Sequence, residues 1–349
     1  MVPALAIADA LRASGAEVHF VGGERAESEL VPAAGYPLHV LPMAGIDRRN
    51  PLRAARAIAL AGAATARARR LLARLEIDVV LGGGGYAAGP VGLAARSLGL
   101  GLVLCEADSH LGLANRLLAP VADRVCLAFE LPGRGPPKFV VTGRAVPAGT
   151  AQPDRARARA RFGIGDEETC LLVFGGSLGA RSLNEAAVRA FGQEAPCTVL
   201  HTCGRRDFEW LRRLLAEAGS PRHYHLHAYV EPFADALGAA DLAVARAGGS
   251  VFELAAAGIP ALLVPYPHAT ANHQAGNARW MVAGGAAVAI SDAELDPRRL
   301  ADEVAALVRD ESRRLEMGTA ALRLARPDAA ERIAAEVLAL APRADAAAA

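Results

Sequence analysis

Short apolar runs alternate with amphipathic segments along nearly the whole chain. Residues 77–81, 170–174 and 241–245 are apolar runs of the length that suits buried parallel strands, and a segment with helical periodicity follows each. This alternation predicts an α/β fold in which helices cover parallel sheets. The last part of the chain is predicted to be helical to about Leu340, with a kink at Pro327.

The length and one irregular segment predict two domains. At 349 residues the chain has room for two domains of ordinary size. Residues 144–156 carry Pro147, Gly149 and Pro153 without an apolar period, which is typical of a linker. We expect one domain at residues 1–147 and a second at 157–326. Residues 327–349 are expected to form a helix that packs back toward the first domain and then frays.

Three glycine-rich turns each follow a predicted strand and open a predicted helix. They lie at residues 82–90, 175–180 and 247–250. Glycine lets the backbone approach a phosphate closely, and the N–H groups at a helix N-terminus attract negative charge. None of the turns fits the dinucleotide fingerprint or the ATP-binding P-loop. Turns in both halves therefore indicate pyrophosphate groups on the two sides of a cleft.

The stretch from residue 241 to 277 combines such a turn with a polar loop. Ser250 is expected to cap the helix that follows the turn, and Gly258 to end it. Glu253 lies in the first turn of this helix and can accept hydrogen bonds from a diol. The next loop offers a neutral hydrogen-bonding set suited to sugar hydroxyls: His268, Asn272, His273, Gln274 and Asn277. The alternative is an ordinary β-α-β unit with solvated loop residues.

Charge and cysteine content narrow the possible partners. The net charge of +1 provides no field for nucleic acid, so no nucleic-acid partner is expected. The five cysteines are odd in number and show no C-x-x-C spacing, which indicates reduced thiols rather than a disulfide framework or a zinc site. No D-x-D motif stands in the cleft loops, and His110, His223 and His225 lack partners at ligand spacing. We therefore expect neither a metal nor a cofactor.

One predicted helix is strongly basic. Residues 48–75 contain eight arginines and no acidic residue. A solvated helix face is one interpretation, and contact with an anionic membrane surface is the other, which we favour. The candidate residues are Arg67, Arg69, Arg70 and Arg74. No stretch has the roughly 18 consecutive apolar residues of a spanning helix, so such contact is expected to be peripheral.

Several motifs, in order, resemble one enzyme family. GGSLGARSLN at 175–184 and RAGGSVFELAAAGIPALLVPYPHATANHQAGNA at 246–278 resemble the C-terminal domain of the peptidoglycan N-acetylglucosaminyltransferases of glycosyltransferase family 28. VPALAIADAL, ESELVPAAGYPLHVLPMAGI, DVVLGGGGYAAGP and the E-A-D-x-x-x-G-L-x-N loop at 106–115 look like the N-terminal domain of that family. The resemblance implies a GT-B fold: two doubly wound Rossmann-like domains, with the donor on the second and the acceptor on the first.

The resemblance also implies the reaction. It is an inverting transfer of N-acetylglucosamine from UDP-N-acetylglucosamine to the C4 hydroxyl of lipid I, undecaprenyl-pyrophosphoryl muramoyl-pentapeptide, which forms lipid II in peptidoglycan biosynthesis. Such an enzyme works without a metal at the cytoplasmic face of the cell membrane. The basic residues of the helix resemble the basic rim of the apolar patch in this family.

Site residues carry over from the matching motifs. Gly175, Gly176, Ser177 and Gly179 match the loop for the donor diphosphate, Tyr229 and Val230 the uracil site, and Glu253 the acid on the ribose. His273, Gln274 and Asn277 match the sugar site, and Arg246 and Gly248 lie in the glutamate-bearing turn. Gly83, Gly84, Gly85, Tyr86 and Asn115 match the acceptor site. Asp108 stands where the family usually has Asn. Asp108 and Glu253 are the candidate catalytic residues.

The chain departs from the family in three places. The first strand and its G-G-T-G-G-H loop, with a histidine important for activity, are absent. We therefore expect in-frame codons for them upstream, and expect the extended protein to be more stable and to transfer sugar while the 349-residue chain is nearly inactive. Pro147 replaces an arginine expected near the donor, a role for which Arg144 is the nearest substitute. The turn that carries Glu253 is one residue shorter than usual.

Two other functions remain open from the sequence. One is a GT-B glycosyltransferase that acts on another lipid acceptor. The second is a non-catalytic or weakly active homologue that binds UDP-sugar or lipid pyrophosphate, an interpretation that the absent glycine loop supports. Acceptor assays distinguish these alternatives.

Overall fold

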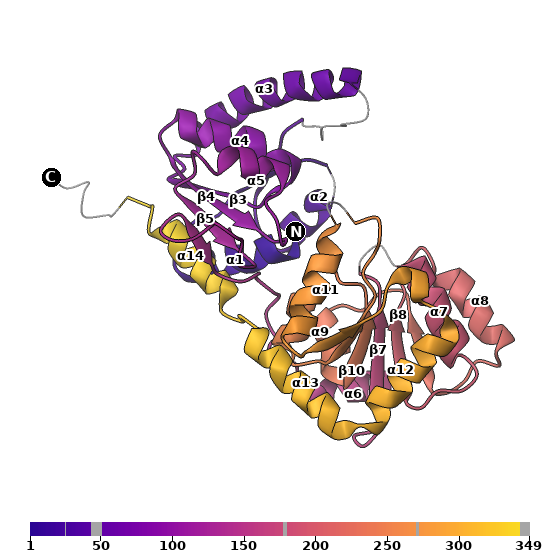
Figure 1. The fold of residues 1–349 in the computed structure, drawn as a ribbon. Coiled ribbons are helices and arrows are strands. Elements are labelled where there is room, and N and C mark those ends of the chain that lie inside the picture. Colours follow the sequence, from indigo (N-terminus) through magenta and orange to yellow (C-terminus); the bar gives the residue numbers. More distant parts are fainter. Residues whose placement is uncertain (25, 43–50, 177–179, 270–271, 343–349) are drawn as a thin grey trace. The chain divides into compact units, whose positions relative to one another are not determined.

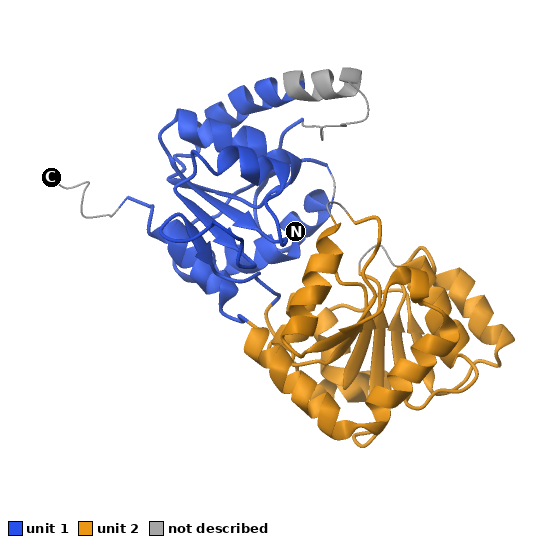
Figure 2. Cartoon of the chain, viewed as in Figure 1, with its two compact units in different colours: residues 1–147, 326–349 blue, residues 148–325 orange. Residues whose placement is uncertain are grey.

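The chain folds into two compact α/β units. The computed structural model describes residues 1–24, 26–42, 51–176, 180–269 and 272–342, and for residues 51–59 it gives the course of the backbone. Residues 1–147 and 326–349 make up the first unit and residues 148–325 the second (Figure 2). Each unit contains parallel strands covered by helices, so the predicted α/β class is confirmed.

The second unit is built on a six-stranded parallel sheet. The strand order is β12-β11-β10-β7-β8-β9. Its strands are β7 (Cys170–Phe174), β8 (Thr198–Thr202), β9 (Tyr224–His227), β10 (Leu242–Ala245), β11 (Ala261–Leu263) and β12 (Ala287–Ala289). The chain runs outward from β7 to β9 and then returns to place β10 on the other side of β7. The sheet therefore has its topological switch point between β7 and β10, where open α/β sheets bind ligands.

Helices pack on both faces of this sheet (Figure 1). They are α6 (Arg155–Phe162), α7 (Arg181–Phe191), α8 (Phe208–Glu217), α9 (Phe233–Ala239), α10 (Val251–Ala256), α11 (His273–Ala283), α12 (Pro297–Arg309) and α13 (Glu311–Leu324). The faces of α7, α8 and α12 share one buried cluster with the strands, in which Phe191 of α7 and Leu211 of α8 are fully buried. Burying each such side chain stabilises the unit by about 1.5–3 kcal/mol.

The first unit has two parallel sheets. The larger has the order β3-β4-β5-β6 and the smaller pairs β1 with β2. The strands are β1 (Phe20–Gly22), β2 (Leu38–Val40), β3 (Val79–Gly82), β4 (Gly101–Glu106), β5 (Arg124–Leu127) and β6 (Phe139–Val141). Helices α3 (Pro51–Arg74), α4 (Gly85–Ser97) and α5 (Leu113–Leu118) lie on one face of the larger sheet, and α1 (Val2–Ala13) and α14 (Ala329–Leu338) on the other (Figure 1).

Helix α1 packs against both sheets of this unit. Ile7 and Leu11 lie in a buried cluster with Val103 of β4, and the same cluster contains α14. Ala8 lies in a second cluster that includes Phe20 of β1. Among the described residues, β1 is bonded only to β2 and β3 only to β4. Helix α2 (Glu27–Ala33) follows β1 and packs beside β2.

The C-terminal region is helical as predicted, but it is divided into three helices, and at Pro327 the chain leaves the helix rather than kinking within it. Asp296 and Asp310 each accept backbone hydrogen bonds as N-caps of α12 and α13. Helix α13 ends at Leu324 and α14 begins at Ala329. Pro327 separates them because a proline disfavours helical geometry at the residue before it.

Candidate functional site

Two glycine turns lie side by side at the switch point of the second unit. The last residue of β7, Phe174, is in register with Ala245, the last residue of β10, so the turns that follow leave the sheet at the same edge. Gly175 is half-buried, and Gly176 is exposed with φ of +86°, a conformation that favours glycine. Ser177 and Gly179 lie outside the described residues. Gly248 follows β10, and the nearest atom to a Cβ placed there would be Nε2 of Gln274 at 4.0 Å.

Helix α10 presents Glu253 beside the second of these turns. Glu253 is half-buried in the first turn of the helix. Ser250 occupies the N-cap position, but its side chain makes no capping hydrogen bond, so that expectation was wrong. The helix ends before Gly258, whose φ of +68° fits the predicted C-terminal glycine.

Side chains from α11 hold the loops around this turn together. Asn277 is fully buried, and its Nδ2 donates to the carbonyl of Ala247 at 3.0 Å. Gln274 accepts a hydrogen bond from the backbone N–H of Tyr266 through Oε1 at 2.9 Å. His273 is half-buried at the first position of α11. Gln274 and Asn277, two of the predicted sugar-binding residues, therefore lie next to the β10 turn in space, although more than 20 residues of sequence separate them from it.

The buried side chain of Arg246 links several segments of the second unit. Its side chain is 5% exposed and forms an ion pair with Asp292 at 2.6 Å. It also donates to Ser182 Oγ at 2.5 Å and to the carbonyl of Val264 at 3.1 Å. These contacts join the β10 turn to the N-terminal part of α7 and to the loop after β11. The sequence gives no indication that Asp292 and Ser182 bind Arg246, because only the fold brings them close to it.

The residues expected at the uracil site follow β9. Val230 is buried, whereas Tyr229 is exposed, with the guanidinium of Arg205 at 5.9 Å from its ring centroid. The pKa of Tyr229 is raised, chiefly by partial burial and also by Glu231. Because the strands are parallel, β9 ends at the same edge of the sheet as β7 and β10. Tyr229 and Val230 therefore lie along the edge that carries the glycine turns, beside the outermost strand.

A third glycine turn lies at the carboxyl end of β3 in the first unit. Gly84 and Gly85 have φ of +79° and +73°, and Gly84 is the N-cap of α4. A Cβ placed on Gly84 would lie 3.6 Å from Nδ2 of Asn115, whereas Gly83 has open space beside it. The structure thus brings Asn115 next to this turn, as the acceptor-site interpretation requires.

Glu106 organises the loop between β4 and α5. Its Oε2 accepts from the N–H of Gly112 at 2.7 Å and from Nδ2 of Asn115 at 3.0 Å. Its Oε1 accepts from the backbone N–H of Asp108 at 3.1 Å. Glu106 is buried and Asp108 is half-buried. Of the residues in this loop, Asp108 and Asn115 were predicted in the site from the sequence and Glu106 was not, although the last position of a buried strand is a signal that could have identified it.

Tyr86 is tied to the loop after β1. Its hydroxyl donates to Oε1 of Glu27 at 2.6 Å, and the same oxygen accepts from the N–H of Gly23 at 2.9 Å. A Cβ on Gly23 would come within 2.4 Å of the Tyr86 hydroxyl, so a larger residue there would displace the Tyr86 side chain. Arg144, the expected substitute near the donor, is half-buried beyond β6 in the first unit.

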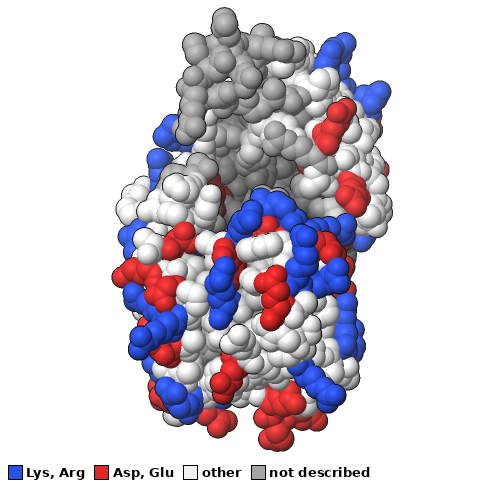
Figure 3. Space-filling model, turned by 90° about the vertical axis from the view of Figure 1, so that its right-hand side faces the viewer, with Lys and Arg blue, Asp and Glu red and all other residues white. Residues whose placement is uncertain are grey.

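Three of the four basic candidates line one groove. Arg67, Arg70 and Arg74 of α3 face residues 38–41, whereas Arg69 does not contribute to the groove. On the face in Figure 3, by contrast, basic and acidic side chains are interspersed. Across the ranges described, we find no helix with both the length and the apolar character needed to cross a bilayer.

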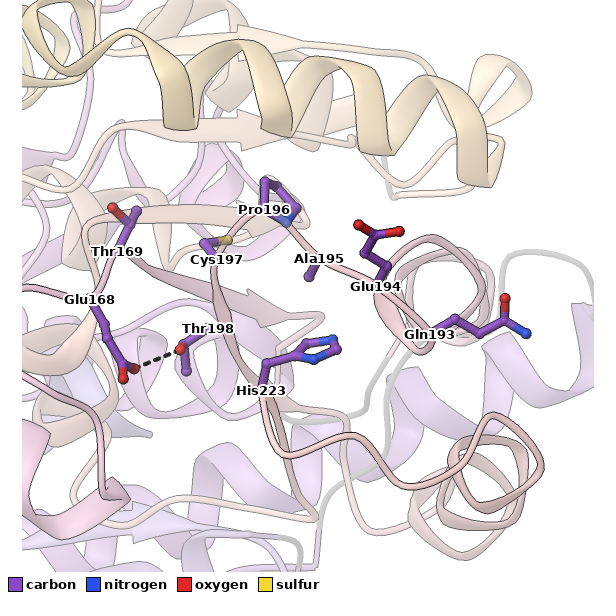
Figure 4. Close-up of a pocket in the computed structure, with 9 residues that line it drawn as sticks. All are labelled: Glu168, Thr169, Gln193, Glu194, Ala195, Pro196, Cys197, Thr198 and His223. Carbon is purple, nitrogen blue, oxygen red and sulfur yellow. Dashed lines mark hydrogen bonds between the residues drawn. The ribbon is translucent and has the colours of Figure 1, made fainter.

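A second pocket belongs to the opposite edge of the second unit. It has a volume of about 420 Å³ and is lined by Glu168, Thr169, residues 193–198 and His223 (Figure 4). Thr198 donates to Glu168 across it at 2.8 Å. These residues stand at the amino ends of β7, β8 and β9, away from the glycine turns.

All five cysteines are free thiols. Burial raises the pKa of Cys170 to about 12, so this thiol is protonated at neutral pH. In the described part of the chain, no group of three or more His, Cys, Asp and Glu side chains is placed to hold a metal ion.

Two Rossmann-like parallel-sheet units, with glycine turns at the carboxyl ends of their strands, define the GT-B fold, which glycosyltransferases share. MurG of Acinetobacter baumannii has this architecture: it superposes with a TM-score of 0.76 over 97% of this chain and 95% of that one, at 30% identity. A glycosyltransferase of kitacinnamycin superposes with a TM-score of 0.72 at 19% identity, a likeness of fold alone.

Sequence comparison then gives the family. The glycosyltransferase family 28 N-terminal domain matches residues 1–127, and the family 28 C-terminal domain matches residues 170–333. The chain belongs to glycosyltransferase family 28, which confirms the resemblance seen in its motifs.

Two curated relatives are similar over nearly the full length. Both are named UDP-N-acetylglucosamine–N-acetylmuramyl-(pentapeptide) pyrophosphoryl-undecaprenol N-acetylglucosamine transferase. The one from Sorangium cellulosum is 42% identical over 97% of this chain and 85% of the relative. The one from Moorella thermoacetica is 39% identical over 96% of this chain and 94% of the relative.

Proposed function

We propose that this protein transfers N-acetylglucosamine from UDP-N-acetylglucosamine to the C4 hydroxyl of the muramoyl sugar of lipid I, with inversion, to form lipid II. The first unit binds the acceptor and the second binds the donor. The observation that carries the proposal is the pair of glycine turns after β7 and β10, joined to Gln274 and Asn277 of α11. This arrangement places backbone N–H groups that can bind phosphate and side chains that can bind a sugar at the same edge of one sheet.

The donor is held by its diphosphate, ribose and sugar in turn. Backbone N–H groups of the β7 and β10 turns receive the diphosphate, as the absence of any atom nearer than 4.0 Å to a Cβ on Gly248 permits. Glu253 accepts hydrogen bonds from the ribose hydroxyls, and His273 and Gln274 bind the hydroxyls of N-acetylglucosamine. Tyr229 and Val230 bind the uracil. Arg246 acts as a positioning residue, because its guanidinium is already bound to Asp292 and Ser182.

The reaction exchanges one bond at the anomeric carbon. The acceptor oxygen forms its bond to C1 as the bond from C1 to the UDP oxygen breaks, and the hydroxyl proton passes to a general base. Asp108 is the candidate base, held by the bond from its backbone N–H to Glu106. The negative charge on departing UDP is stabilised by the backbone N–H groups of the glycine turns.

The acceptor's lipid tail requires a membrane, and the basic helix supports contact with one. Arg67, Arg69, Arg70 and Arg74 are exposed on α3 of the first unit. Each such charge near an anionic surface contributes about 1 kcal/mol. We place the protein as a peripheral enzyme at the cytoplasmic face of the cell membrane.

A panel of donors and acceptors tests the reaction. UDP-N-acetylglucosamine and UDP-glucose are each offered with lipid I, with a lipid I analogue lacking the C4 hydroxyl, and with diacylglycerol. Turnover only with UDP-N-acetylglucosamine and intact lipid I supports the proposal. Turnover on diacylglycerol identifies a different lipid glycosyltransferase, and donor binding without any turnover identifies a binding protein.

A further inference from the structure

The hydroxyl of Tyr86 lies beside the β3 glycine turn and is bound to a carboxylate from another segment. Tyr86 is the second residue of α4 and is half-buried, whereas Gly83 and Gly85 of the turn are exposed. The hydroxyl donates to Oε1 of Glu27, the first residue of α2, at 2.6 Å. This bond joins the loop after β1 to the turn after β3, two strands that are not bonded to each other within the described residues.

The carboxylate of Glu27 is held by the backbone at the end of β1. The N–H of Gly23 donates to the same Oε1 at 2.9 Å. A Cβ on Gly22, the last residue of β1, would lie 2.9 Å from Cγ of Glu27, so the side chain of Glu27 lies directly against the strand end. Oε1 is therefore fixed by one donor from the backbone and presented to a second donor, the phenol of Tyr86.

This bond determines how Tyr86 can interact with a ligand. A phenol has one proton to donate, and its oxygen can also accept a hydrogen bond. A short O–H···O bond to a carboxylate is charge-assisted and among the stronger hydrogen bonds in proteins, so the proton of Tyr86 stays with Glu27. The oxygen of Tyr86 can accept from a ligand in this state, whereas donation to a ligand would require the bond to Glu27 to break.

Lipid I carries groups of both kinds. Its pyrophosphate oxygens are negatively charged and accept hydrogen bonds, which suits the exposed backbone N–H groups of the glycine turn. Its muramoyl-pentapeptide carries hydroxyl and amide N–H groups, which donate hydrogen bonds. The oxygen of Tyr86 is therefore complementary to the muramoyl-pentapeptide and not to the pyrophosphate.

We propose that Glu27 is a positioning residue for the acceptor: by holding the proton of Tyr86, it makes the Tyr86 oxygen accept a hydrogen bond from the muramoyl-pentapeptide of lipid I. The inference rests on the proposed function and specifies which part of the acceptor Tyr86 binds. It predicts that losing the Tyr86 hydroxyl weakens binding of a ligand with the sugar and peptide, and spares a ligand with the pyrophosphate alone.

Undecaprenyl pyrophosphate provides that comparison, because it has the pyrophosphate and the lipid of lipid I without the sugar and peptide. Fluorescently labelled lipid I is bound to the protein in detergent at pH 8 and displaced by either unlabelled ligand. Tyr86→Phe keeps the aromatic ring, and we expect it to weaken lipid I binding about fivefold and undecaprenyl pyrophosphate binding less than about twofold.

Variants of Glu27 test its role separately. Glu27→Ala is expected to weaken lipid I binding about as much as Tyr86→Phe does, and to add little when combined with it, because both changes remove one interaction. Glu27→Gln retains an acceptor oxygen and should restore most of the affinity. Glu29→Ala, at an exposed position of the same helix, is the control and should bind lipid I like the wild type.

The outcomes are distinct. Equal losses for the two ligands in Tyr86→Phe would assign Tyr86 to the pyrophosphate and overturn the proposal. A further large loss from Glu27→Ala in the Tyr86→Phe background would show that Glu27 does not act through Tyr86, and would overturn its role.

Sugar transfer to lipid I is measured in parallel, so that failure of this inference and failure of the proposed function can be told apart. If the wild type transfers sugar while both Tyr86→Phe and Glu27→Ala bind lipid I as it does, the inference fails and the proposed function stands. If the predicted differences in binding are found but no sugar is transferred, the proposed function fails and the inference stands.

Discussion

The side-chain amide of Asn277 donates to the backbone carbonyl of Ala247 at 3.0 Å, in a position without solvent access. This bond joins α11, which begins with the candidate sugar-binding residues, to the glycine turn that follows β10. No hydrogen-bond partner in the described structure reaches the other atom of the amide, Oδ1. Asn277 thus links two parts of the candidate donor site, α11 and the β10 turn.

Replacing Asn277 with alanine is therefore expected to affect both stability and donor binding. The carbonyl of Ala247 would be left buried without its donor, a loss of about 1–3 kcal/mol. Urea unfolding measures the stability, and calorimetry with UDP-N-acetylglucosamine measures the affinity. Arg279→Ala, which alters an exposed residue of the same helix, is the control. An affinity and a stability both equal to those of the control would contradict the coupling.

Glu253 and Gln274 are expected to act on different parts of the donor. Glu253→Ala should weaken binding of both UDP and UDP-N-acetylglucosamine by about 1.5–3 kcal/mol, the effect of losing hydrogen bonds to a charged group. Gln274→Ala should weaken binding of the UDP-sugar while leaving that of UDP nearly intact. Calorimetry with each ligand separates the two variants. Equal losses of UDP affinity would show that the roles are wrongly assigned.

Glu106 is expected to control the acceptor side. Glu106→Gln replaces one acceptor oxygen with an NH₂ group. Depending on which oxygen is replaced, this group faces either Asp108 N or the pair of donors Gly112 N and Asn115 Nδ2. Turnover with lipid I should fall about thirtyfold, equivalent to ~2 kcal/mol. The affinity for UDP should not change, because the donor residues belong to the other unit. Glu130→Gln, at an exposed position, is the control, and a Glu106 variant with the control's turnover would exclude this role.

Parts of this arrangement could be predicted from the sequence and parts could not. Gly84, Gly176 and Gly258 were predictable, because a positive φ is a local property that selects glycine. The ion pair of Arg246 with Asp292 was not, because it depends on how α7, β10 and the segment before α12 meet in space. Asn277 was predicted in the sugar site, but its bond to Ala247 was not, because that bond depends on how α11 packs against the turn.

The acid sensitivity of the second unit should depend on His201. Its Nδ1 lies 2.8 Å from the hydroxyl of Tyr224 and its Nε2 lies 3.1 Å from Oδ1 of Asn184. Burial lowers the pKa of His201 to about 3. Between pH 6.5 and 3 the unfolded chain binds a proton there that the folded chain does not bind. Stability should therefore fall as the pH drops through this range, by about 1.4 kcal/mol per pH unit from this group.

Urea unfolding of wild type and His201→Gln at pH 7.5 and pH 5 measures this contribution. The variant should have the smaller difference in stability between the two pH values, whatever its absolute stability. The exposed His268→Gln is the control and should retain the wild-type difference. If His201→Gln also retains it, the buried histidine is not the source of acid sensitivity.

The central claim is tested most directly by following both products of one reaction. The protein is incubated with lipid I and labelled UDP-N-acetylglucosamine. We predict release of one UDP for each N-acetylglucosamine added, and a product whose new bond joins C1 to the C4 oxygen of the muramoyl sugar in the β configuration. Failure to form this product by a folded preparation that binds UDP-N-acetylglucosamine in calorimetry would contradict the account.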